Sequence, residues 1–216
     1  MLFTNLSTTL AILASIASPF VSARTDIAGV PGDIRPSSPS SYCKQFANAA
    51  PAQGAQFPKG QSCSSEIQGL IPGNDNMVSS LITVPEDGSK IDPAKDFTVT
   101  VLVIGLDSGF ALDPDTQFLL APQTLNPETG FIQGLVSLVI QQLGGTSAPD
   151  PRTFSFFQSF TEESSNGVFN FDVKAGTINS TGEFRICTMV SAASFQPVVM
   201  PVAQRGAQDD CIRVTI

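Results

Sequence analysis

Several short stretches of the chain alternate between apolar and polar residues with a period of two, which is the pattern of strands with one buried face. The clearest covers residues 96–106, polar on one face in its first half and apolar on both faces in its second half. The predicted strands are residues 79–84, 96–106, 117–121, 131–143, 168–173, 183–190 and 211–216. The inward-facing core candidates are Phe169, Phe171, Val173, Phe184, Ile186, Ile212, Val214 and Ile216.

Three segments have a less definite pattern. Residues 131–143 are apolar enough for a helix or a strand, and their Val and Ile content favours a strand, with Gly134 as a candidate β-bulge. Residues 153–160 are rich in Phe and are expected to form a short helix. A second short helix is expected near residues 42–50.

Short strands separated by Gly, Pro and Asn turns indicate an all-β sandwich or barrel. We expect an antiparallel immunoglobulin-like or fibronectin-like β-sandwich over residues 77–216. A loop-rich cap stapled by a disulfide precedes it at residues 42–76, after a flexible arm rich in Pro and Ser at residues 24–41. A helix at residues 131–143 would instead give an α+β fold.

The first 23 residues are predicted to be a signal peptide. An apolar run at residues 10–21 is followed by Ser22 and Ala23, so small residues stand where signal peptidase cuts, and cleavage is expected after Ala23. The run contains Ser and Pro and is shorter than the roughly 18 apolar residues that a membrane span needs. We therefore expect a secreted, extracellular protein that has no membrane contact after cleavage.

The even number of cysteines, four in all, predicts two disulfides in an oxidising compartment. Three pairings are possible, and the favoured one joins Cys43 to Cys63 and Cys187 to Cys211, because each pair lies close together in the sequence. A loop of about 20 residues is stabilised by roughly 3 kcal/mol when it is closed by a disulfide. The cysteine spacing matches no zinc pattern.

Charge and composition exclude several functions. The net charge is −8 and the basic residues are scattered singly, so nucleic acids and anionic membranes are not expected partners. The chain has no His, which excludes Ser-His-Asp and Cys-His catalysis as well as His-ligated zinc. No metal or other cofactor is expected.

Three segments of the sequence together resemble a family of secreted fungal proteins. They are residues 197–216 (PVVMPVAQRGAQDDCIRVTI), residues 76–99 (beginning NMVSSLITV) and residues 113–134 (beginning DPDTQFLLAPQ). Some members of that family are mislabelled after the seventeenth protein of the small ribosomal subunit, although an acidic, exported chain is unsuited to RNA. The resemblance implies a fungal, extracellular protein, wall-associated or host-facing and without an established activity. Relatives often carry Gly-His-x-His after the position of Gln133, where this chain has residues GLVS, so a role of those histidines is not expected here.

Carboxylates are the remaining candidates for catalysis. Asp107 begins an Asp-Ser-Gly triplet, as in aspartic proteases, but no second copy exists, so we interpret it as a strand-ending turn. Asp113 and Asp115, like Glu162 and Glu163, could pair as glycosidase carboxylates, although solvated turns explain them as well.

A polar loop before the last predicted strand is the candidate binding site, and its candidate residues are Gln204, Arg205, Gln208, Asp209 and Asp210. Loops at one end of a sandwich commonly carry the binding residues. The alternative is that this loop is a structural clamp containing an ion pair from Arg205 to Asp209 or Asp210. Asn179 begins a glycosylation sequon between two predicted strands.

The favoured function is therefore non-catalytic binding or a structural role outside the cell, with a cell-wall polysaccharide or a host surface protein as the partner. The alternative is a carboxylate-dependent secreted hydrolase, either a glycosidase or an aspartic-type protease. The absence of Trp and the single Tyr, Tyr42, leave few of the ring platforms that usually bind sugars.

Overall fold

The computed structural model describes residues 43–216 except 47, 49, 53, 55, 57–60 and 165, so the predicted signal peptide and arm lie outside the described residues. Strands dominate the described part, which contains two short 3-10 helices and no α-helix. The elements are η1 (Cys43–Gln45), β1 (Ala50–Pro51), β2 (Ser62–Cys63), η2 (Asn74–Asn76), β3 (Ser79–Val84), β4 (Phe97–Ile104), β5 (Leu106–Ser108), β6 (Ile132–Gln142), β7 (Phe156–Phe160), β8 (Val168–Val173), β9 (Glu183–Ala192) and β10 (Cys211–Thr215).

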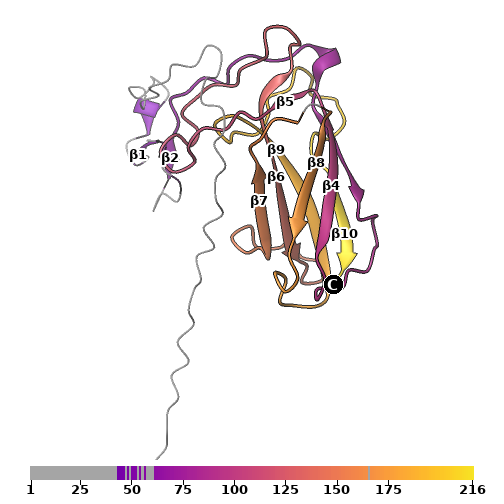
Figure 1. Cartoon of the computed structure of the whole chain (residues 1–216). Coiled ribbons are helices and arrows are strands. Elements are labelled where there is room, and N and C mark those ends of the chain that lie inside the picture. The colour runs from indigo at the N-terminus through magenta and orange to yellow at the C-terminus, as the bar shows by residue number, and fades with distance from the viewer. Residues whose placement is uncertain are drawn as a thin grey trace, which may run out of the picture.

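Two sheets form the body of the molecule (Figure 1). The smaller sheet has the antiparallel order β3-β4-β8. In the larger sheet, β10 pairs with β9 and β9 with β6; the other edge of β6 pairs first with β5 in parallel and then with β7 in antiparallel orientation. For the described residues, the prediction of an all-β fold is confirmed.

One hydrophobic core lies between the two sheets. Both sheets contribute inward side chains because apolar residues recur at every second position of their strands. All eight core candidates from the sequence belong to this core. The ring of Phe160 on β7 meets that of Phe169 on β8 edge-on, with centroids 5.1 Å apart, so aromatic packing helps to join the sheets on that side.

Three local predictions are corrected. Residues 117–121 form a turn instead of a strand, with Leu119 at a positive φ of 57°. Residues 156–160 form β7 instead of a helix, because they extend along the edge of β6 that β5 leaves open. Gly134 is not a bulge: the β6–β9 register begins at Gly134 and shows no shift, and a Cβ there would lie 2.0 Å from the carbonyl oxygen of Ser191.

The segment 131–143 is a strand, β6, which pairs on both of its edges. Near residues 42–50, the described helix is the single 3-10 turn η1. Both disulfides have the favoured pairing: Cys43–Cys63 ties the cap together, and Cys187–Cys211 links neighbouring strands with Cα atoms 4.2 Å apart. That disulfide prediction is confirmed.

Long connections gather with the cap at one end of the body, where β5 lies in Figure 1. The buried side chain of Gln123 joins them: its Nε2 donates to the carbonyl oxygens of Leu70 in the cap and of Val199 after β9. Its Oε1 accepts from the amide of Val199 at 2.8 Å. Because these bonds satisfy a buried amide group, they fix the three segments against each other.

Among the described residues, no helix is long and apolar enough to cross a membrane.

Candidate functional site

The predicted binding loop between β9 and β10 divides into an exposed tip and a bonded base. At the base, the carboxylate Oδ2 of Asp210 accepts a hydrogen bond from the amide of Ile82 on β3 at 2.8 Å. Ser80, also on β3, donates its hydroxyl to the carbonyl oxygen of Gln208 at 2.9 Å. The loop base therefore occupies the free edge of β3 and ties the smaller sheet to the larger one.

Asp209 has a second structural role at this base. It accepts a hydrogen bond from the amide of Val190 on β9 at 2.7 Å. Partial burial raises the pKa of Asp209 above its usual value, while the Val190 hydrogen bond opposes the rise. The carboxyl group of Asp209 therefore ties the base of the loop to β9.

The tip of the loop behaves differently. Gln204 and Arg205 are exposed, and Arg205 donates to the carbonyl oxygen of Val202 and to the side chain of Gln208. The expected ion pair from Arg205 to Asp209 or Asp210 is not among the contacts of the described residues, because backbone amides take up both carboxylates. The clamp exists, but Arg205 is not part of it.

The carboxylates considered for catalysis lie in separate turns or strand ends. Asp107 is the middle residue of β5 and not part of a turn, and its carboxylate accepts a hydrogen bond from the side chain of Asn126. Asp113 accepts from the amide of Asp115 and from the hydroxyl of Thr116. The Asp115 amide bond, followed by the Thr116 hydroxyl, lowers the pKa of Asp113. A lowered pKa suits a turn cap better than a general acid.

Glu162 and Glu163 are exposed in the connection from β7 to β8. Across the described part of the chain, no group of three or more Cys, Asp or Glu side chains is placed to hold a metal ion. Asn179, the sequon residue, is exposed in the connection from β8 to β9.

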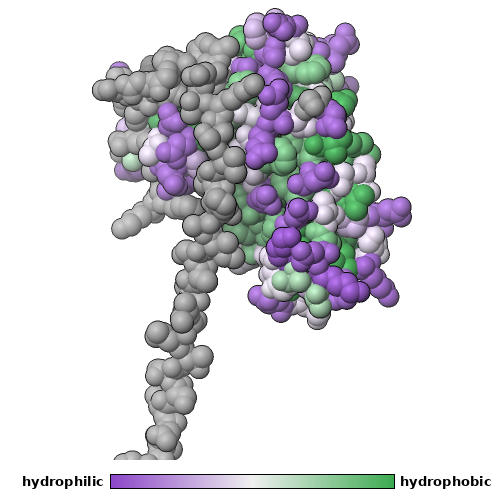
Figure 2. All heavy atoms as spheres, in the orientation of Figure 1, coloured by the Kyte–Doolittle hydropathy of each residue, from purple (hydrophilic) through white to green (hydrophobic). Residues whose placement is uncertain are grey.

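An exposed apolar surface lies on the outer face of the smaller sheet, and the sequence analysis did not assign it a role. We call it the apolar strip and define it as Leu81, Val84, Leu102 and Ile104. The register brings these residues together, since Leu81 is opposite Leu102, and Val84 is opposite Thr100 after a bulge. Ile104 is 67% exposed. Figure 2 shows apolar surface among polar side chains on the face that carries β4 and β8.

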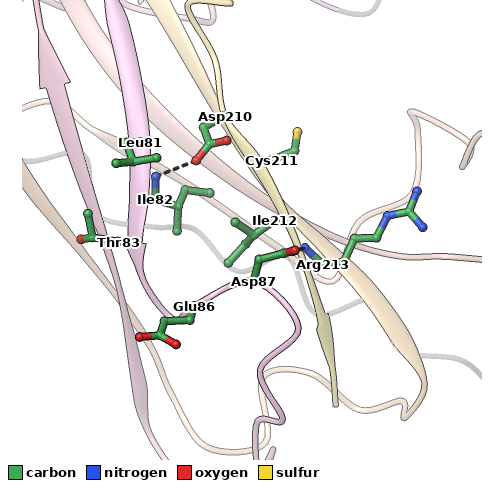
Figure 3. A pocket seen from close by; sticks show the side chains of 9 residues that line it. All are labelled: Leu81, Ile82, Thr83, Glu86, Asp87, Asp210, Cys211, Ile212 and Arg213. Carbon is green, nitrogen blue, oxygen red and sulfur yellow. Dashed lines mark hydrogen bonds between the residues drawn. The ribbon is translucent and has the colours of Figure 1, made fainter.

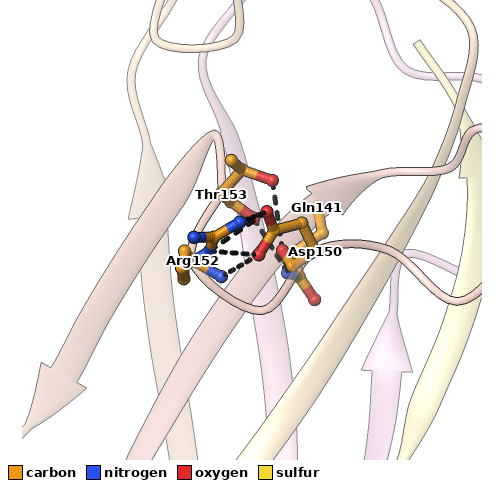
Figure 4. Close-up of polar contacts among 4 residues, drawn as sticks. All are labelled: Gln141, Asp150, Arg152 and Thr153. Atoms are coloured by element: carbon orange, nitrogen blue, oxygen red, sulfur yellow. Dashed lines mark hydrogen bonds and ion pairs between the residues drawn. The ribbon is translucent and has the colours of Figure 1, made fainter. Parts of the chain in front are cut away.

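Phe157 and Met189 are exposed on the larger sheet, but hydrogen bonds cover another part of it. Gln141 on β6 is buried; its Nε2 donates to the carbonyl oxygens of Asp150 and Thr153, so the β6–β7 connection is pinned to it (Figure 4). Its Oε1 accepts two hydrogen bonds from Arg185 on β9. Arg152 completes this connection with an exposed ion pair to Asp150, whose atoms lie 2.7 Å apart.

A groove of about 540 Å³ lies beside the apolar strip, between the edge strands β3 and β10. Residues 81–83 form one wall, residues 210–213 form the other, and Glu86 and Asp87 close its lower end in the view of Figure 3. Leu81 belongs to both the strip and the groove, so the two features form one continuous surface.

Residues 80–216 match the profile of a protein family described as the CLU5d N-terminal domain. The chain belongs to this family. All four residues of the apolar strip and all nine groove residues fall within the matched range. The expected resemblance to a fungal protein family is confirmed in this coarse form.

One curated relative of this chain is the "Pathogenicity cluster 5 protein d" of Colletotrichum graminicola, a fungus. It is 37% identical over 159 residues, which cover 72% of this chain and 33% of the relative. The chain thus spans about a third of the length of the curated relative it matches. No solved structure matches the chain.

Sequence reasoning missed the strip and the groove for different reasons. Residues 102 and 104 stand in a run that is apolar on both faces, and such a run usually indicates a strand buried on both sides. The groove joins residues about 130 positions apart in the sequence, so no local pattern could indicate it.

Proposed function

We propose that this chain is a non-catalytic binding module of an exported fungal protein, and that its apolar strip binds a protein at the host surface. The relative named for a pathogenicity cluster supports a host-directed role. The two disulfides are compatible with export to an oxidising compartment. The predicted signal peptide, with cleavage after Ala23, is part of the same proposal.

The observation that carries the proposal is the exposure of the apolar strip. Its members are 41–67% exposed on a sheet whose register fixes their spacing. Contiguous apolar surface of this kind is a common mark of protein–protein interfaces. A protein is favoured over a cell-wall polysaccharide because the strip consists of branched aliphatic side chains and offers no ring on which a sugar could stack.

The arrangement of the body is consistent with such a module. We infer that the two sheets form an immunoglobulin-like or fibronectin-like sandwich, with β3, β4 and β8 in one layer and β5, β7, β6, β9 and β10 in the other. The supporting feature is that successive strands are divided between the two layers. The sequon at Asn179 would place a glycan on the exposed connection from β8 to β9.

The competing hydrolase proposal has weaker support. Asp107 and Asp113 each accept hydrogen bonds that hold local backbone or side chains in place. A pair of catalytic carboxylates would need one group with a raised pKa, and the pKa of Asp113 is lowered.

The test is a pull-down of extracellular host proteins on the immobilised chain, in three forms: wild type, Leu102→Ser/Ile104→Ser, and the control Phe157→Ser. Phe157 is a suitable control because it is as exposed as Leu102, 41% each, but lies on the larger sheet. We expect a host protein that the wild type and the control retain equally and that the double variant retains at least about tenfold less, as for an interface hot spot.

Three outcomes would overturn the proposal. Equal retention by all three forms would show that the strip is not the binding surface. Turnover of glycans or casein that is lost in Asp107→Asn would favour the hydrolase, and sedimentation of the chain with insoluble glucan or chitin, unchanged in the double variant, would favour a polysaccharide ligand.

A further inference from the structure

The groove between β3 and β10 has an apolar floor. Ile82 and Ile212 form it from opposite walls, and both belong to the core, with exposed fractions of 5% and 7%. Figure 3 shows their side chains facing each other across the groove. A floor of this kind suits an aliphatic stem, such as the methylene groups of a lysine or arginine side chain.

Carboxylates surround that floor. Asp210 lies at one end, and Glu86 and Asp87 lie at the other (Figure 3). The one basic residue among the lining residues is Arg213, and its guanidinium group points away from the groove in that view. The lining therefore presents negative charge around an apolar floor.

Two of the carboxylates are fixed in position by backbone amides. Asp210 accepts from Ile82 with Oδ2, and Asp87 accepts from the amide of Arg213 with Oδ1 at 2.7 Å. In the part of the chain that the structure describes, the second oxygen of each group makes no hydrogen bond. Each can accept one from a cation without loss of the bond that holds it, and such charge-assisted bonds are stronger than neutral ones.

The wall formed by β10 also presents a peptide group. The amides of Arg213 and Thr215 point away from β9, since they donate to Asp87 and to Ser89 in the turn after β3. Cys211 is two residues before Arg213, so by the period of the strand its peptide group faces the same side, into the groove. An extended partner backbone could pair with it, as in strand addition at a sheet edge.

We propose that this groove takes a lysine or arginine side chain of the protein partner that covers the apolar strip. The inference rests on the proposed function and names the chemistry of its partner: a segment with a basic residue next to apolar residues. Leu81 belongs to both surfaces, so the basic residue and the apolar residues of the partner must lie next to each other. The apolar strip would supply contact area, and the groove would select the charge.

The test uses two peptides, acetyl-Gly-Leu-Lys-Leu-Gly-amide and its counterpart with glutamine in place of lysine, titrated into the isotope-labelled chain and followed by amide chemical shifts. We expect the lysine peptide to shift the signals of residues 81–83, 86–87 and 210–213 and to bind at least about fivefold more tightly than the glutamine peptide. The difference should shrink in about 0.5 M sodium chloride, because the charges are partly exposed.

Two matched double variants distinguish binding in the groove from attraction to the overall negative charge of the chain. Glu86→Gln/Asp87→Asn removes two groove charges and keeps an acceptor for the amide of Arg213. Asp75→Asn/Glu128→Gln removes two exposed charges elsewhere. The preference for lysine should vanish in the first variant and persist in the second, with unchanged melting midpoints showing that both are folded.

The outcomes also separate this inference from the proposed function. Equal binding of both peptides, with shifts at residues 102 and 104, would overturn the groove inference and leave the apolar strip as a binding surface. Shifts in the groove alone would support the groove and count against the strip. A lysine preference lost equally in both variants would overturn the inference, because it would mean attraction to the overall charge.

Discussion

The two faces of the smaller sheet carry similar residues in opposite environments. Along β4, Val99, Val101 and Val103 point inward and are at most 5% exposed, whereas Leu102 and Ile104 between and after them point outward and are 41% and 67% exposed. The inward face is committed to the core shared with the larger sheet. Apolar residues on the outward face cannot serve that core, and we propose that they contact another molecule.

The largest expected effect on stability comes from a Leu→Ala substitution, made once at a buried position and once at an exposed one. Leu138→Ala on β6, where the side chain is fully buried, should reduce the free energy of unfolding by about 2–5 kcal/mol, because it leaves a cavity in the core. Leu102→Ala should change it by less than about 0.5 kcal/mol, as at other exposed positions. Urea unfolding of both variants measures the difference. A similar loss in both would mean that the outward face is covered in the folded protein.

The next effect concerns the edge of the smaller sheet. Asp210→Ala removes the acceptor for the amide of Ile82 and should reduce the free energy of unfolding by about 1–2 kcal/mol. Asp210→Asn keeps an acceptor oxygen and serves as the control, with a smaller loss. Thermal unfolding checks both, and an alanine variant as stable as the wild type would show that β3 does not need this clamp.

A pH dependence should identify the second carboxyl of the clamp. Burial raises the pKa of Asp209 in the folded protein above its usual value of 3.8, so its contribution to stability is complete below that value and is lost as the pH rises through the raised pKa. Asp209→Asn, which cannot ionise, should therefore gain stability relative to the wild type between about pH 3 and about pH 7. The gain should stay below about 1 kcal/mol, since water still screens the half-exposed group.

Asp150→Asn provides the contrast for that measurement. The Arg152 side chain, followed by the Arg152 amide, lowers the pKa of Asp150, so this carboxylate stabilises the fold above its usual pKa and loses its contribution as the pH falls. Its stability difference from the wild type should therefore change with pH in the opposite direction. Free energies of unfolding of both variants across the same pH range give the comparison, and parallel curves would contradict our placement of Asp209.

The smallest effect is expected at the tip of the β9–β10 loop. Arg205→Ala should change the free energy of unfolding by at most about 0.5 kcal/mol, because the side chain is exposed and bonds to Val202 and Gln208 of its own loop. A melting midpoint that fell by several degrees would place Arg205 in the clamp together with Asp209 and Asp210.

The fold could be predicted from the sequence where one face of a strand is buried and the other is not. The strands around Phe169, Phe184 and Val214 alternate strictly, and the structure confirms all of them. Residues 153–160 are rich in Phe, which we interpreted as a short helix, and only the open edge of β6 makes residues 156–160 a strand. Residues 117–121 have the composition of a strand, but they find no partner strand and form a turn.

The candidate site could also be predicted from the sequence only in part. The polar loop at residues 204–210 could be predicted because its polar residues follow one another in the sequence. Which of its residues bond to β3 depends on how that distant strand approaches the loop. Thus Asp209 and Asp210 belong to a clamp, while Gln204 and Arg205 stay at the tip.

By itself, the sequence predicted most of the strands, part of the core and the favoured pairing of both disulfides, because periodicity and nearby cysteine pairs are local properties of the chain. Only the tertiary structure decided which apolar residues remain in contact with water and which carboxylates meet around a groove. Leu81 and Leu102 become neighbours through strand pairing, and Asp87 and Asp210 through the approach of two sheet edges. Such contacts depend on how sheets pack, and that is a property of the whole chain.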